Sequence, residues 1–269
     1  MFTALLGVIL GAALPPQALD QWGWRIPFVI GCLIIPVLFL LRRYLPETEA
    51  FRARKHRPSA AEVWRTLVRN WRIVLIGVML VTMTTVSLYL ITAYTPTFAK
   101  QELRLAPTAY LTVTLCVGLS KFIWLPVMGS VSDRIGRIPI LAGATIVTLL
   151  TAYPAMLWLI AAPSFTRLLM VELWLYFLYA SYNGAMVVTL TEIMPEEVRT
   201  AGFSLAYSLA TALFGGFTPY ICESLIKATG NQAAPGLWMS TAAALGLIAT
   251  LLLRRREKRR GLELARAAA

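Results

Sequence analysis

The chain has 269 residues, of which 58% are hydrophobic and 14% charged, and its mean hydropathy is +0.68. One soluble core cannot bury that much apolar surface, so the composition predicts an all-α integral membrane protein and excludes an ordinary soluble domain. The formal charge of +12 does not indicate nucleic-acid binding, because the basic residues cluster in short segments beside apolar runs, as in membrane proteins.

Residues that carry enzyme or metal chemistry are few. The three cysteines, Cys32, Cys116 and Cys222, lie in separate apolar runs without C-x-x-C spacing, and the single histidine, His56, sits in a basic segment. No disulfide framework, metal site or cofactor is therefore expected. The apolar runs also lack a histidine pair, an H-E-x-x-H sequence and a Ser/His/Asp set, so we do not expect an enzyme.

The chain opens with two apolar runs. Residues 1–15 supply roughly 22 Å of helix, which is less than the roughly 30 Å of a bilayer core, and we interpret them as a clipped spanning helix. A signal peptide is the alternative, although no Lys or Arg precedes the run. Trp22 and Trp24 then form an aromatic belt before a second span at residues 26–41.

A basic segment follows the second span. Residues 42–72 hold nine of the 25 basic residues and three acids, which predicts a cytoplasmic linker. Within it, Ser59-Ala-Ala-Glu62 matches a capping box, and Val63 and Leu67 give the next residues an apolar stripe. We expect a short helix here that lies on the membrane surface.

Six further apolar segments are long enough to span a bilayer, which makes about eight spans in all. Alternating sides from the linker places 19 basic residues inside, five outside and Lys121 within the membrane. The basic tail, residues 254–269, is therefore predicted to be cytoplasmic. The six predicted spans are residues 73–96, 108–131, 138–162, 168–191, 200–222 and 236–253.

Polar residues recur at helical spacing in four of these spans, and in lipid such stripes must face protein or a water-filled cavity. Small and hydroxyl residues also hold membrane helices together, and for the last stripe we regard packing and cavity lining as equally supported. The stripes are Thr82, Thr85, Tyr89 and Thr92; Thr114, Gly118 and Lys121; Glu172, Tyr176, Tyr179 and Asn183; and Ser204, Ser208, Thr211, Gly215 and Thr218.

Lys121 stands apart, because an ammonium group inside a span costs several kcal/mol unless it is paired or hydrated. We hypothesise that Lys121 attracts a substrate carboxylate, with Tyr89, Tyr179 and Asn183 on the other stripes as further ligands. The alternative is a lysine that snorkels or that pairs structurally, for example with Glu172.

Between the second and third of the six spans lies Gly129-Ser-Val-Ser-Asp-Arg-Ile-Gly-Arg137. Gly129 and Gly136 allow close backbone approach or a turn, and Asp133, Arg134 and Arg137 can exchange charge-assisted hydrogen bonds. These features predict a tight charged hairpin. Its order, G-x-x-x-D-R-x-G-R, resembles the loop signature of the major facilitator superfamily.

Other stretches narrow the resemblance. Residues 22–28, 45–49 and 192–202 look like the metabolite:proton symporter branch of that superfamily. Within the branch, residues 89–98, 182–186 and 202–219 are most similar to citrate–proton symporters.

The resemblance implies a bundle of twelve helices in two halves that rock around a central site. Residues 1–41 would be the last two helices of the N-terminal half and residues 73–253 the whole C-terminal half, so the chain would hold helices five to twelve. It implies proton-coupled import of citrate or a related tricarboxylate across a bacterial inner membrane. Because the first four helices would be missing, the chain alone is not expected to transport.

The resemblance also implies a gate that closes the cytoplasmic side. Simple surface salt bridges are the alternative for these charges. For the protein as a whole, the alternatives are a non-transporting membrane assembly protein and a symporter for another small organic acid. The implied gate residues are Gly129, Asp133, Arg134, Gly136, Arg137, Glu192 and Arg199.

Overall fold

The structure is a computed structural model that describes residues 21–44 and 60–267, together with Leu6, Leu10, Pro15 and Ala18. The chain divides into two compact units, Met1–Ser59 and Ala60–Ala269. Apart from three positions, the predicted first span, residues 1–15, lies outside the described residues, and so do residues 45–49 and His56.

The first unit contains an apolar helix with one interruption. Helix η1 (Gly23–Arg25) leads into α3 (Ile26–Cys32), and α4 (Ile34–Tyr44) follows after Leu33. Pro36 has no N–H to donate to the carbonyl of Cys32, which explains the interruption. Together the two helices provide a run that is long and apolar enough to cross a membrane, as the sequence predicted.

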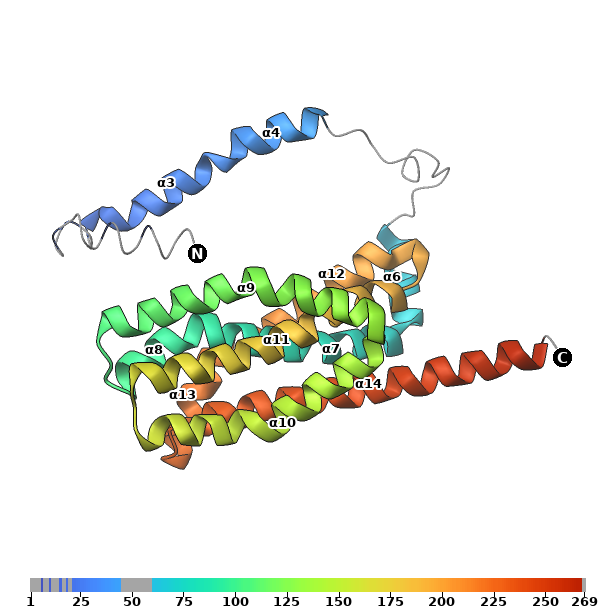
Figure 1. Cartoon of the computed structure of the whole chain (residues 1–269). Helices are drawn as coiled ribbons and strands as arrows, with labels where there is room; N and C mark the ends of the chain where they lie inside the picture. Colours follow the sequence, from blue (N-terminus) through green and yellow to red (C-terminus); the bar gives the residue numbers. More distant parts are fainter. Residues whose placement is uncertain are drawn as a thin grey trace. The chain divides into compact units, whose positions relative to one another are not determined.

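The second unit is a bundle of long helices joined by short connections (Figure 1). Because the connections are short, consecutive long helices run in opposite directions. Its elements are α6 (Ala60–Arg69), α7 (Trp71–Tyr89), η2 (Leu90–Tyr94), α8 (Thr95–Gln101), α9 (Pro107–Ile135), α10 (Arg137–Ala161), α11 (Phe165–Ile193), η3 (Glu196–Val198), α12 (Arg199–Ala210), η4 (Thr211–Gly215), α13 (Thr218–Thr229) and α14 (Ala234–Ala267).

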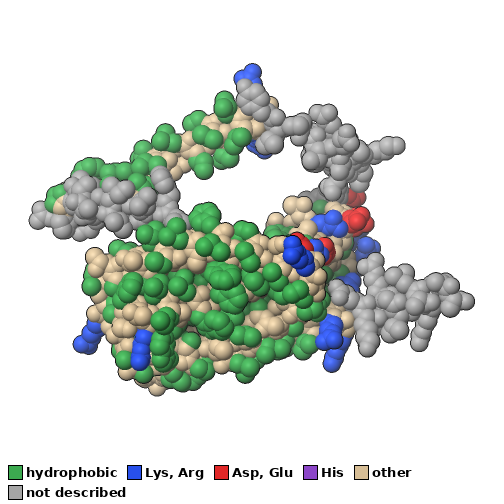
Figure 2. Space-filling model, in the orientation of Figure 1, with side chains coloured by type: hydrophobic (Ala, Val, Ile, Leu, Met, Phe, Trp, Pro, Cys, Tyr) green, Lys and Arg blue, Asp and Glu red, His purple; other side chains and the backbone are tan. Residues whose placement is uncertain are grey.

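The described residues include seven helical runs that are long and apolar enough to cross a membrane, so the chain is a multi-pass membrane protein. These runs match seven of the eight predicted spans. In the second unit, hydrophobic side chains cover the middle of the visible face and charged side chains gather at its two ends (Figure 2). The runs are Ile26–Arg43, Trp71–Gln101, Pro107–Ile135, Arg137–Ala161, Phe165–Ile193, Glu196–Thr229 and Ala234–Arg256.

One end of the bundle contains the single-residue connection Gly136, and we call it the Gly136 end. The start of α12 and the end of α11 meet at the same end, because α9 and α11 run in one direction and α10 and α12 in the other. Helix α6 also belongs there, since Leu67 is buried and would lie 3.4 Å from a Cβ added at Gly202.

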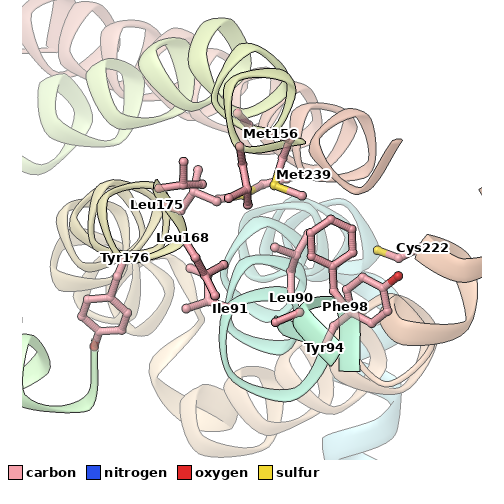
Figure 3. Packing of buried hydrophobic residues seen from close by; sticks show 14 of the residues in the cluster. Leu90, Ile91, Tyr94, Phe98, Met156, Leu168, Leu175, Tyr176, Cys222 and Met239 are labelled. Carbon is pink, nitrogen blue, oxygen red and sulfur yellow. The ribbon is translucent and has the colours of Figure 1, made fainter. Parts of the chain in front are cut away.

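Helices α7 and α11 lie within the bundle, and each contains ten or more buried residues. Helix α11 packs along α9 and α10, while α14 packs along α10 and α7. Two clusters of buried side chains result. The cluster in Figure 3 joins Leu90, Ile91 and Phe98 of the α7–α8 run to Leu168 and Leu175 of α11.

Two of the membrane runs are broken in the same way. In the first, the π-turn η2 precedes Pro96 in the first turn of α8, and in the second, η4 precedes Pro219 in the first turn of α13. Proline has no N–H for the regular helical hydrogen bond, and a wider turn ahead of it lets the chain continue. The two breaks divide α7 from α8 and α12 from α13, and the sequence prediction did not include them.

Candidate functional site

The charged hairpin predicted from the sequence is a one-residue turn between α9 and α10. Gly136 has φ 101° and ψ 150°, a conformation that is open almost only to glycine. Its N–H donates to the Ser132 carbonyl at 3.0 Å, which ends α9, and α10 begins at the next residue. The turn therefore directs Asp133 and Arg137 to the same end of the bundle.

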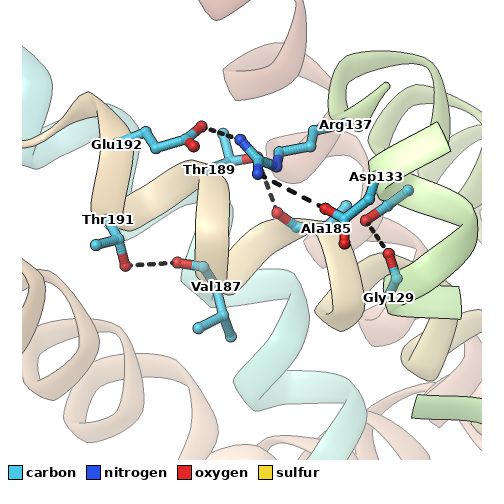
Figure 4. A network of polar contacts seen from close by, with 9 residues as sticks. Gly129, Asp133, Arg137, Ala185, Val187, Thr189, Thr191 and Glu192 are labelled. Atoms are coloured by element: carbon cyan, nitrogen blue, oxygen red, sulfur yellow. Dashed lines mark hydrogen bonds and ion pairs between the residues drawn. The ribbon is translucent and has the colours of Figure 1, made fainter. Parts of the chain in front are cut away.

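Arg137 is the centre of the polar contacts at this turn (Figure 4). Its Nη1 donates to Glu192 Oε2 near the end of α11, and its Nη2 lies 3.7 Å from Asp133 Oδ1 in α9. One guanidinium thus links three helices. The three side chains are between 31% and 66% exposed, so each pair contributes under about 1 kcal/mol to stability.

Two of the predicted gate cations lie apart from this cluster. Arg199 pairs with Glu196 in its own segment, with Nη2 and Oε1 3.7 Å apart. Arg134 is exposed and forms no ion pair with the residues that the structure describes. The contacts therefore join three of the seven predicted gate residues, namely Asp133, Arg137 and Glu192.

Close helix packing beside the hairpin depends on Gly184 of α11, which the sequence prediction did not assign to packing. A Cβ at Gly184 would lie 2.9 Å from the backbone nitrogen of Gly129 and 3.2 Å from its Cα. A Cβ at Gly129 itself would meet none of the described residues within 4 Å. The missing side chain of Gly184 therefore lets α11 approach α9 closely, and the atoms that it approaches are the backbone atoms of Gly129.

A cavity of about 580 Å³ lies beside the Arg137 cluster. It is lined by the α9–α10 turn, by Thr189 and Glu192 of α11 and by Leu253 and Arg256 of α14. The sequence prediction assigned Arg256 to the tail, but α14 continues as a helix past the predicted span and places this arginine at the cavity. Hydropathy could not predict the full length of α14, because its last turns are charged rather than apolar.

Lys121 lies in α9 with an exposed side chain, between Leu119 and the exposed Phe122 and Ile123. It forms no hydrogen bond or ion pair with the described residues. In particular, it does not pair with Glu172, which contacts Thr95 instead. The structural pairing considered from the sequence is therefore not formed in this structure.

The other predicted substrate residues lie on α7 and α11. Tyr179 is 5% exposed and its ring is 5.3 Å from that of Tyr176. Tyr89 is partly buried and packs close to Gly215 of η4. Asn183 has a buried Oδ1 that finds no hydrogen-bond partner among the described residues.

Depth along the bundle separates Lys121 from Asn183. Gly129 lies against Gly184, and the rings of Trp124 and Phe177 are 4.8 Å apart, so α9 and α11 are parallel with a fixed register. This register sets Lys121 level with Trp174 to Tyr176. Asn183 is about two helical turns, or roughly 10 Å, nearer the Gly136 end. A ligand shared by both residues would have to extend along the bundle axis.

Tyr207 of α12 belongs with these residues although the sequence prediction omitted it. It lies near both Tyr89 and Tyr179. The helical spacing could have indicated this residue, because Tyr207 lies three positions after Ser204 and four before Thr211, on the same polar stripe. Thr211 Oγ1 is also buried without a hydrogen-bond partner in the described part of the chain.

Comparison with known proteins supplies the family. The model of the Major Facilitator Superfamily matches residues 1–219. The chain belongs to the major facilitator superfamily. The family resemblance drawn from the hairpin is thereby confirmed, together with the prediction of an all-α bundle.

Individual relatives narrow the comparison. The chain is 54% identical over 250 residues to a citrate-proton symporter of Salmonella typhi and 55% identical over 256 residues to one of Klebsiella pneumoniae. These alignments cover 93% and 95% of this chain but 58% of each relative, so the chain spans little more than half their length. It is also 29% identical to an alpha-ketoglutarate permease of Escherichia coli, over 96% of this chain and 59% of that protein.

Proposed function

We propose that the protein transports citrate or a related tricarboxylate together with protons, by alternating access. The observation that carries this proposal is the identity of 54% and 55%, over nearly all of this chain, to two proteins named citrate-proton symporters. Family membership supports the mechanism, because such transporters rock two helical halves around a central site.

The substrate site in this proposal contains Lys121, Tyr89, Tyr179 and Asn183. Carboxylates leave water only where cations or several donors replace their hydration, and Lys121 supplies a cation within a span. The unpartnered oxygen of Asn183 supports a polar ligand at that depth, since buried polar atoms are normally hydrogen-bonded. Lys121 would then bind one end of the substrate, with Asn183 toward the other.

The gate in this proposal closes the Gly136 end. Arg137 ties α9, α10 and α11 together there, and breaking these contacts would let the helix ends separate. Because the contacts are partly exposed and individually weak, they suit an equilibrium between two conformations. Arg134, Arg199, Gly129 and Gly136 would belong to the same moving end.

We further propose that the Gly136 end and the C-terminus face the cytoplasm of a bacterial cell, with the described spans equivalent to helices six to twelve of the family. The division of basic residues, 19 against five, supports this orientation. A reporter fused after Ala269 should be active only in the form that works in the cytoplasm. Activity of a periplasmic reporter at that point would reverse the orientation.

Uptake of labelled citrate by cells that express the protein from its gene tests the function. We expect uptake that excess unlabelled citrate or tricarballylate suppresses and that 2-oxoglutarate suppresses less. Stronger suppression by 2-oxoglutarate would favour a symporter for another organic acid, consistent with the likeness to the permease. No uptake above that of cells without the gene, with the protein present in the membrane, would favour the assembly protein.

A further inference from the structure

Glu172 is a buried acid that the proposed substrate site and gate do not use. It lies in the second turn of α11 and is 2% exposed. Its Oε1 is 2.7 Å from Thr95 Oγ1 of α8, and its Oε2 is buried without a partner in the described part of the chain. The same two segments that carry Thr95 and Glu172 contribute Leu90, Ile91 and Leu168 to the buried apolar cluster of Figure 3.

None of the basic residues that the structure describes forms an ion pair with this carboxyl group. On the helices that pack around it, the basic side chains nearest this end are Lys100 of α8, Lys121 of α9, Arg167 of α11 and Lys227 of α13, and none forms an ion pair with Glu172. Arg167 instead donates to the Trp158 carbonyl at 2.8 Å and lies over the Trp158 ring.

The remaining charged and titratable groups on these helices do not neutralise a carboxylate either. Tyr94 and Tyr176 are buried phenols of the same cluster, and Glu102 and Glu223 are acids. Arg72, Asp133, Arg134, Arg137, Glu192 and Arg199 belong to the Gly136 end. Arg104, in the connection between α8 and α9, is exposed and forms no ion pair with Glu172. An ionised Glu172 would be an unpaired buried charge, which costs several kcal/mol, whereas the protonated form avoids that cost.

The contacts of Thr95 also favour a protonated Glu172. Thr95 Oγ1 is 2.7 Å from Glu172 Oε1 and 3.1 Å from the Leu90 carbonyl oxygen, yet a hydroxyl has one hydrogen. If Glu172 were ionised, these two oxygens would have to share that hydrogen. A protonated Glu172 donates to Thr95 Oγ1, and Thr95 then donates to Leu90, so both contacts are hydrogen bonds of normal length.

The π-turn η2 makes this chain of hydrogen bonds possible. It brings the Leu90 carbonyl within reach of both the Thr95 N–H and the Thr95 hydroxyl. Thr95 is the first residue of α8, so the hydrogen bonds connect the segment beyond the break to α11. The protonation of Glu172 therefore affects the hydrogen bonds that hold α8 against α11.

We propose that Glu172 is the site of the coupled proton, and that the bound proton fastens α8 to α11 through Thr95 and Leu90. The inference rests on the proposed function as a proton symporter. Loss of the proton leaves a buried anion that only a rearrangement toward water can stabilise, so binding and release of the proton shift the population between conformations.

Infrared spectroscopy of the purified full-length protein tests the site without transport. We expect the carbonyl band of a protonated carboxyl group at neutral pH, lost in Glu172→Gln and retained in the control Glu102→Gln. Glu102 is an acid at the end of α8 that is only partly buried and accepts from Gln232. Thr95→Val should shift the band, whereas Thr95→Ser, which keeps the hydroxyl, should not. A band unchanged in Glu172→Gln, or one that sodium ions remove at constant pH, would overturn the proposal.

Transport separates this inference from the proposed function. Gln keeps the size of the protonated acid and can donate to Thr95, so Glu172→Gln should fold normally. We expect it to lose citrate accumulation driven by a proton gradient but to retain exchange of labelled for unlabelled citrate. Gradient-driven accumulation equal to that of the natural protein would refute Glu172 as the proton site while leaving citrate transport established. If the natural protein takes up no citrate, the proposed function fails, and the infrared band still decides whether Glu172 holds a proton.

Discussion

Arg137 at the start of α10 donates a hydrogen bond to Glu192 near the end of α11, although 55 positions separate them in the sequence. The same guanidinium lies 3.7 Å from Asp133 of α9. If this cluster holds one conformation closed, Arg137→Ala should slow transport while leaving citrate affinity largely unchanged. Rates of uptake and equilibrium binding, measured on the same preparation, check this.

The matched control for Arg137 is Lys227→Ala, which removes an exposed cation at the opposite end of the bundle. The double variant Arg137→Ala with Glu192→Ala should be no slower than Arg137→Ala alone, because the first change already breaks the contact. Loss of citrate binding in Arg137→Ala would contradict the gate and assign the arginine to the substrate site.

Gly184 and Gly129 should respond differently to the same substitution. Gly184→Ala inserts a methyl group 2.9 Å from the Gly129 backbone and should cost about 1–3 kcal/mol, as overpacking does. Gly129→Ala adds a methyl group that meets no atom of the described part of the chain within 4 Å and should be close to neutral. Thermal unfolding in detergent measures both, and equal losses would show that α9 and α11 do not approach as described.

Gly136 and Gly230 provide a second contrast, because both have positive φ. Gly136, at φ 101° and ψ 150°, occupies a region nearly closed to other residues, whereas Gly230, at φ 66° and ψ 6°, is in the left-handed helical region that Asn also adopts. Gly136→Asn should therefore cost about 1–3 kcal/mol and Gly230→Asn clearly less. The apparent unfolding temperature of each variant tests the order, and the reverse order would contradict the turn geometry.

Lys121→Met keeps the apolar stem and deletes the charge. Because Lys121 has no ion pair with the described residues, the variant should insert and unfold like the natural protein but lose citrate binding. Lys121→Arg, which preserves the charge, is the control and should bind more weakly without losing the substrate. Titration calorimetry gives the affinities. Unchanged affinity in Lys121→Met would remove the lysine from the substrate site.

Hydropathy was sufficient for the spans of the second unit, because lipid requires long, continuous apolar helices. Each predicted span overlaps an observed run and its ends differ from those of the run by at most seven residues, although α14 continues beyond residue 253 as a charged helix. The hairpin was also predictable, because its glycine and its charges are adjacent in the sequence.

The contacts between distant positions were not predictable in the same way. The predicted stripe of α11 treats Glu172 and Asn183 as one surface, yet Glu172 is buried against α8 while Asn183 lies about three helical turns away along the bundle. The helical spacing of polar residues shows which face of a helix they share. It does not show which other helix packs against that face at each position along its length. Likewise, Thr82 and Thr85 donate to carbonyls of their own helix, so part of the α7 stripe serves local hydrogen bonding.

We propose that protons and citrate move together through this protein. The most direct test reconstitutes the full-length protein in liposomes that contain a pH indicator and adds citrate outside, with no initial pH gradient. We expect that citrate entry acidifies the lumen in proportion to the citrate taken up, and that an inward proton gradient drives citrate accumulation. Citrate entry without any proton movement would contradict it.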